Sequence, residues 1–243
     1  MKNLAIDIGN TRLKLGVFQH QKLIFKEEKE VLKSIQVLEK VLDSHTFQNI
    51  LLASTGNPEK VVTLLEQRGL LYKILDHKTP VPFKNSYKSP ETLGVDRMAL
   101  VAAATKHYPE QDVLVIDAGT CVTYDFKNKN EEYLGGSISL GLSMRFKALH
   151  HFTAKLPLLE ASKIPEYIGK NTAEAIESGV IHGILTEIKG VIDWYRSIYP
   201  ELTIILTGGD ALFLSKTLKN GIFAHQNFLL EGLDYIMVFN TTQ

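Results

Sequence analysis

Residues 4–11 read Leu-Ala-Ile-Asp-Ile-Gly-Asn-Thr, and residues 113–120 read Val-Leu-Val-Ile-Asp-Ala-Gly-Thr. Each stretch is an apolar run that reaches an aspartate and then turns on glycine and threonine. An alternating stretch follows in both places, at residues 12–18 and 121–126, and such period-two alternation predicts a strand. The sequence therefore predicts two related hairpins that lie 110 residues apart, a separation of about the size of a domain.

The same order of elements continues after each hairpin. A third strand is predicted at residues 23–25 and at residues 133–138, so both halves open with a three-stranded meander. Helices are expected at residues 31–42, 58–67 and 94–108, and further strands at residues 49–54 and 203–207. Residues 173–199 are expected to form one long helix or a pair of helices, and residues 228–239 a final amphipathic helix. Helices that alternate with strands after an antiparallel start predict an α/β fold with mixed sheets. We expect two lobes, residues 1–111 and 112–243.

Composition excludes several classes of protein. The 27 Lys and Arg residues equal the 27 Asp and Glu residues, so no net charge favours binding to nucleic acid or to an anionic membrane. Asp7 interrupts the first apolar run, which argues against a signal peptide, and no run approaches the roughly 20 residues that span a bilayer. Cys121 is the only cysteine, which fits a reducing compartment and is expected to be a buried structural thiol. We expect a cytoplasmic protein.

The two turns carry groups that bind phosphate. Glycine after a strand exposes backbone N–H groups, and such a concave run of N–H groups binds anions. The threonine hydroxyl adds a donor, and the aspartate can hold a cation that offsets nucleotide charge. One such turn is weak evidence, because Asp-Gly turns are common in hairpins. Two matching turns, with a third at Thr207-Gly208-Gly209-Asp210, favour nucleotide binding.

Three such turns in this order resemble the sugar kinase, acetate kinase and actin superfamily. The resemblance implies two ribonuclease H-like lobes with mixed sheets flanked by helices, and a nucleotide cleft between the lobes. Within the superfamily, the motifs resemble those of type III pantothenate kinases and run in order along nearly the whole chain. The matching segments are residues 7–11, 94–97, 117–120, 135–138, 171–179 and 207–211. The family usually has Pro before the glycine at position 141, whereas this chain has Leu140.

This resemblance implies ATP-dependent phosphorylation of pantothenate to 4′-phosphopantothenate, the first step of coenzyme A biosynthesis. The implied ATP-binding residues are Asp7, Ile8, Gly9, Asn10, Thr11, Arg12, Leu13, Lys14 and Thr120. The implied substrate-binding residues are Tyr87, Gly94, Val95, Asp96, Arg97 and Thr172. Mg²⁺ would accompany ATP, and Asp117 would hold K⁺ or NH₄⁺. Relatives of this type are homodimers whose pantothenate site is shared between chains.

Each of these assignments competes with a purely structural role. Asp96 is the candidate general base, but a carboxylate at a helix start is also favoured by the helix dipole. Arg97 is expected to bind the pantothenate carboxylate, and Tyr87 to close over the substrate. Lys14 is either a phosphate ligand or a solvated strand residue. Thr172 either contacts pantothenate or caps its helix, a role that Asn171 could equally take.

Other functions remain open at this level. Another small-molecule kinase of the superfamily would keep the hairpins without the two motifs at residues 94–97 and 171–172. A non-catalytic regulatory relative should have lost Asp96 or Asp117, and both are present. An actin-like filament protein is disfavoured by the short chain.

Overall fold

The computed structural model describes residues 2–31, 34–218 and 221–241. The chain divides into two compact units. Unit 1 comprises Met1–Glu110, Lys127–Gly135 and Asn227–Gln243, and unit 2 comprises Gln111–Phe126 and Gly136–Gln226. The predicted lobes, residues 1–111 and 112–243, stay a prediction.

Unit 1 is built on a five-stranded sheet in the order β3-β2-β1-β4-β5. Its strands are β1 (Lys2–Ile8), β2 (Arg12–Gln19), β3 (Lys22–Glu30), β4 (Asn49–Ser54) and β5 (Lys73–Ile74). The first three form the predicted antiparallel meander, whereas β4 pairs in parallel with β1 and β5 in parallel with β4. The sheet is therefore mixed, as the sequence predicts.

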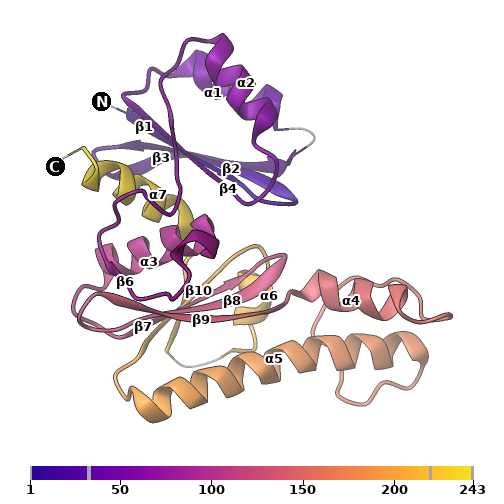
Figure 1. Cartoon of the computed structure of the whole chain (residues 1–243). Helices are drawn as coiled ribbons and strands as arrows, with labels where there is room; N and C mark the ends of the chain where they lie inside the picture. Colours follow the sequence, from indigo (N-terminus) through magenta and orange to yellow (C-terminus); the bar gives the residue numbers. More distant parts are fainter. Residues whose placement is uncertain (1, 32–33, 219–220, 242–243) are drawn as a thin grey trace. The chain divides into compact units, whose positions relative to one another are not determined.

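Helices cover both faces of this sheet (Figure 1). The helices α1 (Ile35–Ser44) and α2 (Glu59–Gln67) lie on one face, where leucines, isoleucines and valines of the sheet and of both helices form one core. The other face packs against α7 (Phe228–Phe239), and α7 packs in turn against α3 (Val95–His107). Two short elements precede α3, the strand β6 (Lys84–Asn85) and a 3₁₀ turn (Pro90–Thr92).

The second sheet has the order β11-β10-β7-β8-β9-β6. Its longer strands are β7 (Val113–Ala118), β8 (Cys121–Lys127), β9 (Glu132–Leu140) and β10 (Thr203–Thr207), with β11 (Ile222–Ala224) at one edge. The strands β7, β8 and β9 are the second predicted meander, and β10 pairs in parallel with β7 and β11. Unit 2 also holds α4 (Leu142–His151), α5 (Thr172–Ile198) and α6 (Ala211–Ser215).

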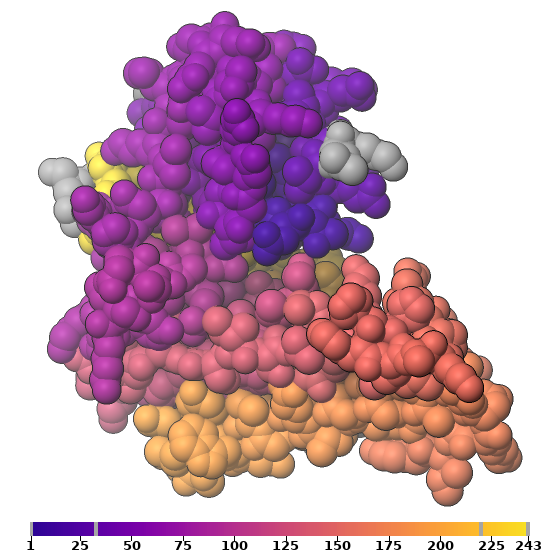
Figure 2. Space-filling view, turned by 45° about the vertical axis from the view of Figure 1, so that its right-hand side comes forward, coloured from indigo at the N-terminus to yellow at the C-terminus, as the bar shows by residue number. Residues whose placement is uncertain are grey.

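The core of unit 2 lies between its sheet and α5. Apolar residues of α5 that recur at helical spacing, such as Ile181, Ile184 and Ile188, are fully buried against Leu114, Ile116 and other strand residues. Figure 2 shows α4 and α5 side by side on the surface of unit 2. The sequence left open whether residues 173–199 form one helix or two, and the structure has one.

Several predicted elements have their expected bounds, and others differ. The strands at 49–54 and 203–207 and the helix at 228–239 are confirmed to the residue. The helix predicted over residues 31–42 instead begins at Ile35 and ends at Ser44, and Leu32 lies outside the described residues. The helix α7 is less amphipathic than predicted, because eight of its residues are buried between the sheet and α3. The helices α4 and α6 were not predicted.

Candidate functional site

The first Gly-Asn-Thr turn presents backbone and hydroxyl groups to solvent. It joins β1 to β2 and is closed by a hydrogen bond from the Gly9 amide to the Arg12 carbonyl oxygen, at 2.9 Å. The side chains of Ile8 and Leu13 are buried in the sheet, whereas Asn10 and Thr11 are exposed. Only main-chain atoms of Ile8 and Leu13 are thus available to a ligand. The exposed part of the turn has the donors that a phosphate needs.

The end of β4 supports this turn from behind. The amides of Thr55 and Gly56 both donate to the carbonyl oxygen of Ile8, at 2.9 and 3.2 Å. A Cβ atom at Gly56 would lie 2.7 Å from the carbonyl oxygen of Gly9, so only glycine allows this approach. The sequence analysis missed Thr55 and Gly56. Their role follows from the parallel pairing of β1 with β4, which no local pattern reveals.

Asp7 and Lys14 form an ion pair across the first hairpin. They are register partners on β1 and β2, and the Lys14 Nζ lies 3.4 Å from the Asp7 Oδ2. Burial raises the pKa of the Asp7 carboxyl, Lys14 lowers it, and the negative charges of Asp96 and Glu28 raise it. Asp7 is 4% exposed, so the carboxylate is held beneath the turn by one partly exposed cation. Arg12, by contrast, pairs with Glu28 at the surface, at 3.0 Å.

Asp96 lies in the first turn of α3, as predicted. Its Oδ1 accepts a hydrogen bond from the Arg97 amide at 2.8 Å, which fixes the carboxylate at the positive end of the helix. Gly94, the N-cap residue, has no side chain to compete for this place. A Cβ atom at Gly94 would lie 2.4 Å from the Asp96 Oδ1, so glycine here decides where the carboxylate lies.

Arg97 lies against two tyrosine rings. Its guanidinium carbon is 5.5 Å from the ring centre of Tyr87 and 6.0 Å from that of Tyr133, distances typical of cation–π contacts. The two rings are stacked with centres 6.0 Å apart. Arg97 is 4% exposed and Tyr133 is fully buried, so this cluster fixes the arginine near Asp96. The sequence analysis missed Tyr133, because its place beside Tyr87 depends on the pairing of β6 with β9.

The Asp117 turn of unit 2 is built from three glycine-containing segments. Asp117 pairs with Thr207 in the parallel β7–β10 ladder, and the Asp210 amide donates to the Ala118 carbonyl oxygen at 2.9 Å. Gly208 has a positive φ of 95°, and a Cβ atom there would lie 2.3 Å from the Asp117 Oδ1. The second and third predicted glycine turns, at residues 117–120 and 207–210, are thus in direct contact around Asp117.

The end of β9 and the following Gly141 lie against this turn, and Leu140 stands where the resemblance leads one to expect proline. The Gly141 amide donates to the Thr120 carbonyl oxygen at 3.2 Å, and a Cβ atom at Gly141 would lie 2.3 Å from that oxygen. The Arg145 Nε donates to the Leu140 carbonyl oxygen at 2.9 Å, while its Nη2 contacts Glu187. Arg145 therefore fixes the backbone at Leu140, the position at which a proline would have made the backbone more rigid.

Asn171, rather than Thr172, caps α5. The Asn171 Oδ1 accepts from the Glu174 amide at 3.0 Å, and the Asn171 Nδ2 donates to the Glu174 side chain at 2.9 Å. Thr172 is the first helical residue, and it is exposed. It lines an open groove of about 720 Å³ along α4 and α5, which is otherwise mostly apolar. The capping alternative for Thr172 is thereby removed, and its hydroxyl is available to another group.

The predicted site residues thus gather in two places. In unit 1, the structure places the first turn and the Asp7–Lys14 pair within electrostatic reach of Asp96, which adjoins the cluster around Arg97. In unit 2, Asp117 and Thr120 lie at the turn between β7 and β8, and Thr172 is the first residue of α5. Within the described residues there is no cluster of three or more His, Cys, Asp or Glu side chains suited to a metal ion. No described helix has the length and apolarity that crossing a membrane requires.

Solved structures of known proteins share this fold. One is named for the Baf family of transcriptional activators, from Campylobacter jejuni, with a TM-score of 0.65 and 22% identity over 99% of this chain and 100% of that one. Another is named as a 2-dehydro-3-deoxygalactonokinase, from Sinorhizobium meliloti, with a TM-score of 0.57 and 13% identity over 97% and 95% of the two chains. Together with the two mixed sheets, these matches confirm the predicted α/β fold with mixed sheets flanked by helices. The predicted nucleotide cleft stays a prediction.

Sequence comparison identifies the family. The profile of the type III pantothenate kinases matches residues 3–194. A type III pantothenate kinase from Christiangramia forsetii is 49% identical over 99% of this chain and 100% of its own length. The chain therefore belongs to the type III pantothenate kinase family.

Proposed function

We propose that this protein phosphorylates pantothenate with Asp96 as the general base. Membership of the family makes the chain an ATP-dependent kinase that acts on pantothenate in coenzyme A biosynthesis. The observation that carries the assignment of the base is the position of the Asp96 carboxylate. The carboxylate lies at the start of α3, where it accepts a hydrogen bond from the Arg97 amide at 2.8 Å. The neighbouring Gly94 has no Cβ atom, which would otherwise occupy the same space.

In this mechanism, Asp96 accepts the proton of the pantothenate hydroxyl as its oxygen attacks the γ-phosphorus of ATP. The new oxygen–phosphorus bond forms while the bond to the β-phosphate oxygen breaks, which gives 4′-phosphopantothenate and ADP. Phosphoryl transfer needs little covalent help from the protein, so positioning and charge dominate. The half-buried Asp96 meets the first requirement, because its carboxylate has a fixed direction.

The first turn supplies donors for the outer phosphates. The amides of residues 9–14 and the Thr11 hydroxyl would bind the phosphate oxygens, while Ile8 and Leu13 contribute only their backbone. Lys14 would offset phosphate charge from its place beside Asp7. Mg²⁺ usually keeps several waters and is held by one or two carboxylates together with phosphates. Asp7 would be that carboxylate, and Mg²⁺ would offset charge on the transferred group.

The cluster around Arg97 provides the substrate carboxylate with a partner. Arg97 presents a planar pair of donors that match a carboxylate, and the rings of Tyr87 and Tyr133 fix its orientation. The partly exposed Tyr87 would cover bound pantothenate. Gly94 and Val95, at the start of α3, would line the same site through their backbone.

Asp117 would hold K⁺ or NH₄⁺. Its carboxylate lies beside the carbonyl oxygen of Ala118, and the carbonyl oxygens of Gly119 and Thr120 are a few residues along the same turn. Carboxylate and carbonyl oxygens in a loop suit a large, weakly hydrated cation better than Mg²⁺, which demands tight octahedral geometry. Such a cation would offset the negative charge of ATP. We also propose a homodimer in the cytoplasm, in which Thr172 reaches the substrate bound by the partner chain.

Two assays test this function. Purified protein with ATP and Mg²⁺ should phosphorylate pantothenate in preference to a panel of small alcohols and sugars. Activity on a sugar but not on pantothenate would indicate another kinase of the superfamily, and binding without turnover a regulatory relative. At matched ionic strength, K⁺ or NH₄⁺ should support a higher rate than Na⁺. Equal rates in Na⁺ and K⁺ would indicate that Asp117 only orders its own turn.

A further inference from the structure

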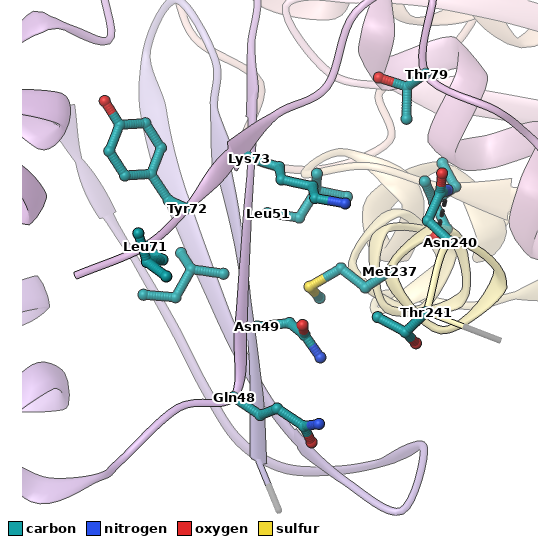
Figure 3. Close-up of a pocket in the computed structure, with 12 residues that line it drawn as sticks. Gln48, Asn49, Leu51, Leu71, Tyr72, Lys73, Thr79, Met237, Asn240 and Thr241 are labelled. Carbon is teal, nitrogen blue, oxygen red and sulfur yellow. Dashed lines mark hydrogen bonds between the residues drawn. The ribbon is translucent and has the colours of Figure 1, made fainter. Parts of the chain in front are cut away.

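A cavity in unit 1 lies away from the predicted site residues. It has a volume of about 380 Å³ and is enclosed by the first residues of β4, by β5 and by the end of α7 (Figure 3). The first Gly-Asn-Thr turn follows β1, whose parallel partner β4 runs from Asn49 at the cavity to Ser54 beside the turn. Its volume lies near the lower end of the range of small-molecule sites, about 300–1,000 Å³.

The walls of the cavity are mostly apolar. Ile50 and Leu51 of β4 and Ile236 and Met237 of α7 line it, and each is at most 5% exposed. Leu71 also lines the cavity and is 92% exposed, which is unusual for an apolar side chain. The apolar part of a ligand would cover Leu71 and fill the space between the strands and α7. The resulting free energy of binding would be proportional to the apolar area removed from water.

Lys73 is the one charged residue among the described residues that line the cavity. The lining residues are Gln48, Asn49, Ile50, Leu51, Leu71, Tyr72, Lys73, Thr79, Ile236, Met237, Asn240 and Thr241, and none of them is acidic. Lys73 extends from β5 with its ammonium group toward α7, as Figure 3 shows. Within the described parts of the chain, this ammonium group has no ion-pair partner.

Most polar groups around Lys73 already have partners. The Asn240 Nδ2 donates to Pro80 and Ile236 carbonyl oxygens, the Thr241 hydroxyl to that of Val238, and the Tyr72 hydroxyl to Glu66. Lys73 is therefore the group that would select a ligand. A single ammonium matches a carboxylate, which carries one negative charge, better than a phosphate monoester, which carries more.

We propose that this cavity binds a small amphipathic carboxylate, and that its occupation is communicated through α7 to α3. The helix α7 lines the cavity near its end and packs against α3 along its length. A Cβ atom at Gly232 would lie 1.8 Å from the Ala99 carbonyl oxygen, so the two helices are in backbone contact. A displacement of α7 cannot be absorbed by side chains there, and α3 carries Asp96 and Arg97.

A hydrogen-bonded chain provides a second connection. The Asn49 Nδ2, at the cavity wall, donates to the Asn3 Oδ1 at 3.0 Å, and the Asn3 Nδ2 donates to the Asp234 Oδ1 at 3.0 Å. Asp234 is fully buried in the middle of α7. The effect of the ligand on catalysis rests on the proposed function, whereas binding and the change in α3 do not.

The four methionines allow both steps to be tested without an activity assay. Met237 lines the cavity, Met98 lies on α3, and Met144 lies on α4 in unit 2. The full-length protein labelled with [¹³C-methyl]methionine would be titrated with octanoate below its micellar concentration. We expect a saturable shift of the Met237 signal, a shift of Met98 over the same concentrations, and none of Met144.

The role of charge in binding can be tested by changing either the ligand or Lys73. Octylammonium and octanamide have the same chain without the negative charge and should bind at least about tenfold more weakly than octanoate. Lys73→Gln should weaken octanoate binding about tenfold, equivalent to about 1.4 kcal/mol, whereas Lys60→Gln, an exposed lysine on α2, should not.

Three results would overturn the proposal. An unchanged Met237 signal, or octanoate affinity that Lys73→Gln leaves intact, would reject the binding site. A shift of Met237 with no shift of Met98 would reject the communication to α3. Because the methionine signals do not depend on turnover, these tests remain valid even if the protein fails to phosphorylate pantothenate.

Discussion

Gly94 influences the position of the proposed base, Asp96, without providing a functional group itself. Its Cβ position would lie 2.4 Å from the Asp96 Oδ1, and the carboxylate is the more mobile of the two groups. Gly94→Ala should therefore displace the carboxylate while the backbone stays in place. Because misplacement by about 1 Å can cost about 100-fold in rate, we expect kcat to fall about 10- to 100-fold.

This prediction is checked by steady-state kinetics, with circular dichroism to verify folding. Gly190→Ala is the matched control, because a Cβ atom there meets no other group and alanine favours the α5 helix. Gly190→Ala should keep wild-type kcat. A Gly94→Ala variant with unchanged kcat would show that the position of Asp96 is set by other residues.

Asp7 illustrates a conflict between stability and function. Burial is the main cause of its raised pKa, so the ionised form is disfavoured in the folded chain even beside Lys14. The stability that protonated Asp7 contributes is fully present below its unfolded pKa of about 3.9 and is lost as the pH rises through its raised folded pKa. Asp7→Asn should remove this loss, so it should be more stable than wild type at pH 7 yet inactive.

Urea unfolding between pH 4 and pH 8 would measure the difference. The difference in free energy of unfolding between Asp7→Asn and wild type should grow as the pH rises. It should level off once Asp7 is ionised in the folded wild-type protein. If the variant were instead less stable at every pH, attraction to Lys14 would outweigh the cost of burial.

Motif residues could be identified from the sequence, but several of their partners could not. Asp7, Asp96 and Arg97 stand in short motifs, whose chemistry can be interpreted locally. Tyr133 and Gly56 act through strand pairings between distant segments. Their positions depend on the register of those pairings, and the register is a property of the fold.

At the scale of elements, the start of α5 holds a capping residue, Asn171, beside a proposed substrate-binding residue, Thr172. Asn171→Ala removes the oxygen that caps the Glu174 amide and should lower the free energy of unfolding by about 1 kcal/mol. Thr172→Ala leaves that cap intact and should change stability little, but it should raise KM for pantothenate. Thermal unfolding and kinetics on the two variants would test this. Equal loss of stability in both would mean that Thr172 also supports the helix.

Long elements were predictable, and short ones were not. Strands such as β4 and β10 have continuous apolar runs with polar flanks, and α7 has helical spacing throughout. The strands β5 and β6 have two residues each, too few to show a period. The helix α4 has the spacing of Leu142, Phe146 and Leu149, yet it follows a glycine-rich strand end, and no helix was predicted there.

At the scale of the whole molecule, the proposed homodimer makes a specific prediction about shared sites. Mixing Asp96→Asn chains with chains that carry a bulky residue at Thr172 should restore one working site in each heterodimer. Activity should exceed that of either variant alone, at most about one quarter of wild type when chains mix randomly in equal amounts. Light scattering would establish the mass, and a fully active monomer would contradict the shared site.

At this scale, the order of the elements along the chain was predictable, whereas the packing of distant elements against one another was not. The repeated hairpins correctly indicate two mixed sheets. The last helix, α7, packs against the first sheet although it is far from that sheet in sequence. Apolar spacing shows that α7 must be buried, but not which surface buries it.

The central claim is that Asp96 is the base for transfer of phosphate to pantothenate. The most direct test is kcat of Asp96→Asn with ATP and pantothenate, because asparagine keeps the size of the side chain but cannot accept the proton. The account predicts a fall of about 10²- to 10⁴-fold with unchanged secondary structure and melting temperature close to wild type. A purified, folded Asp96→Asn protein with near wild-type kcat would contradict it.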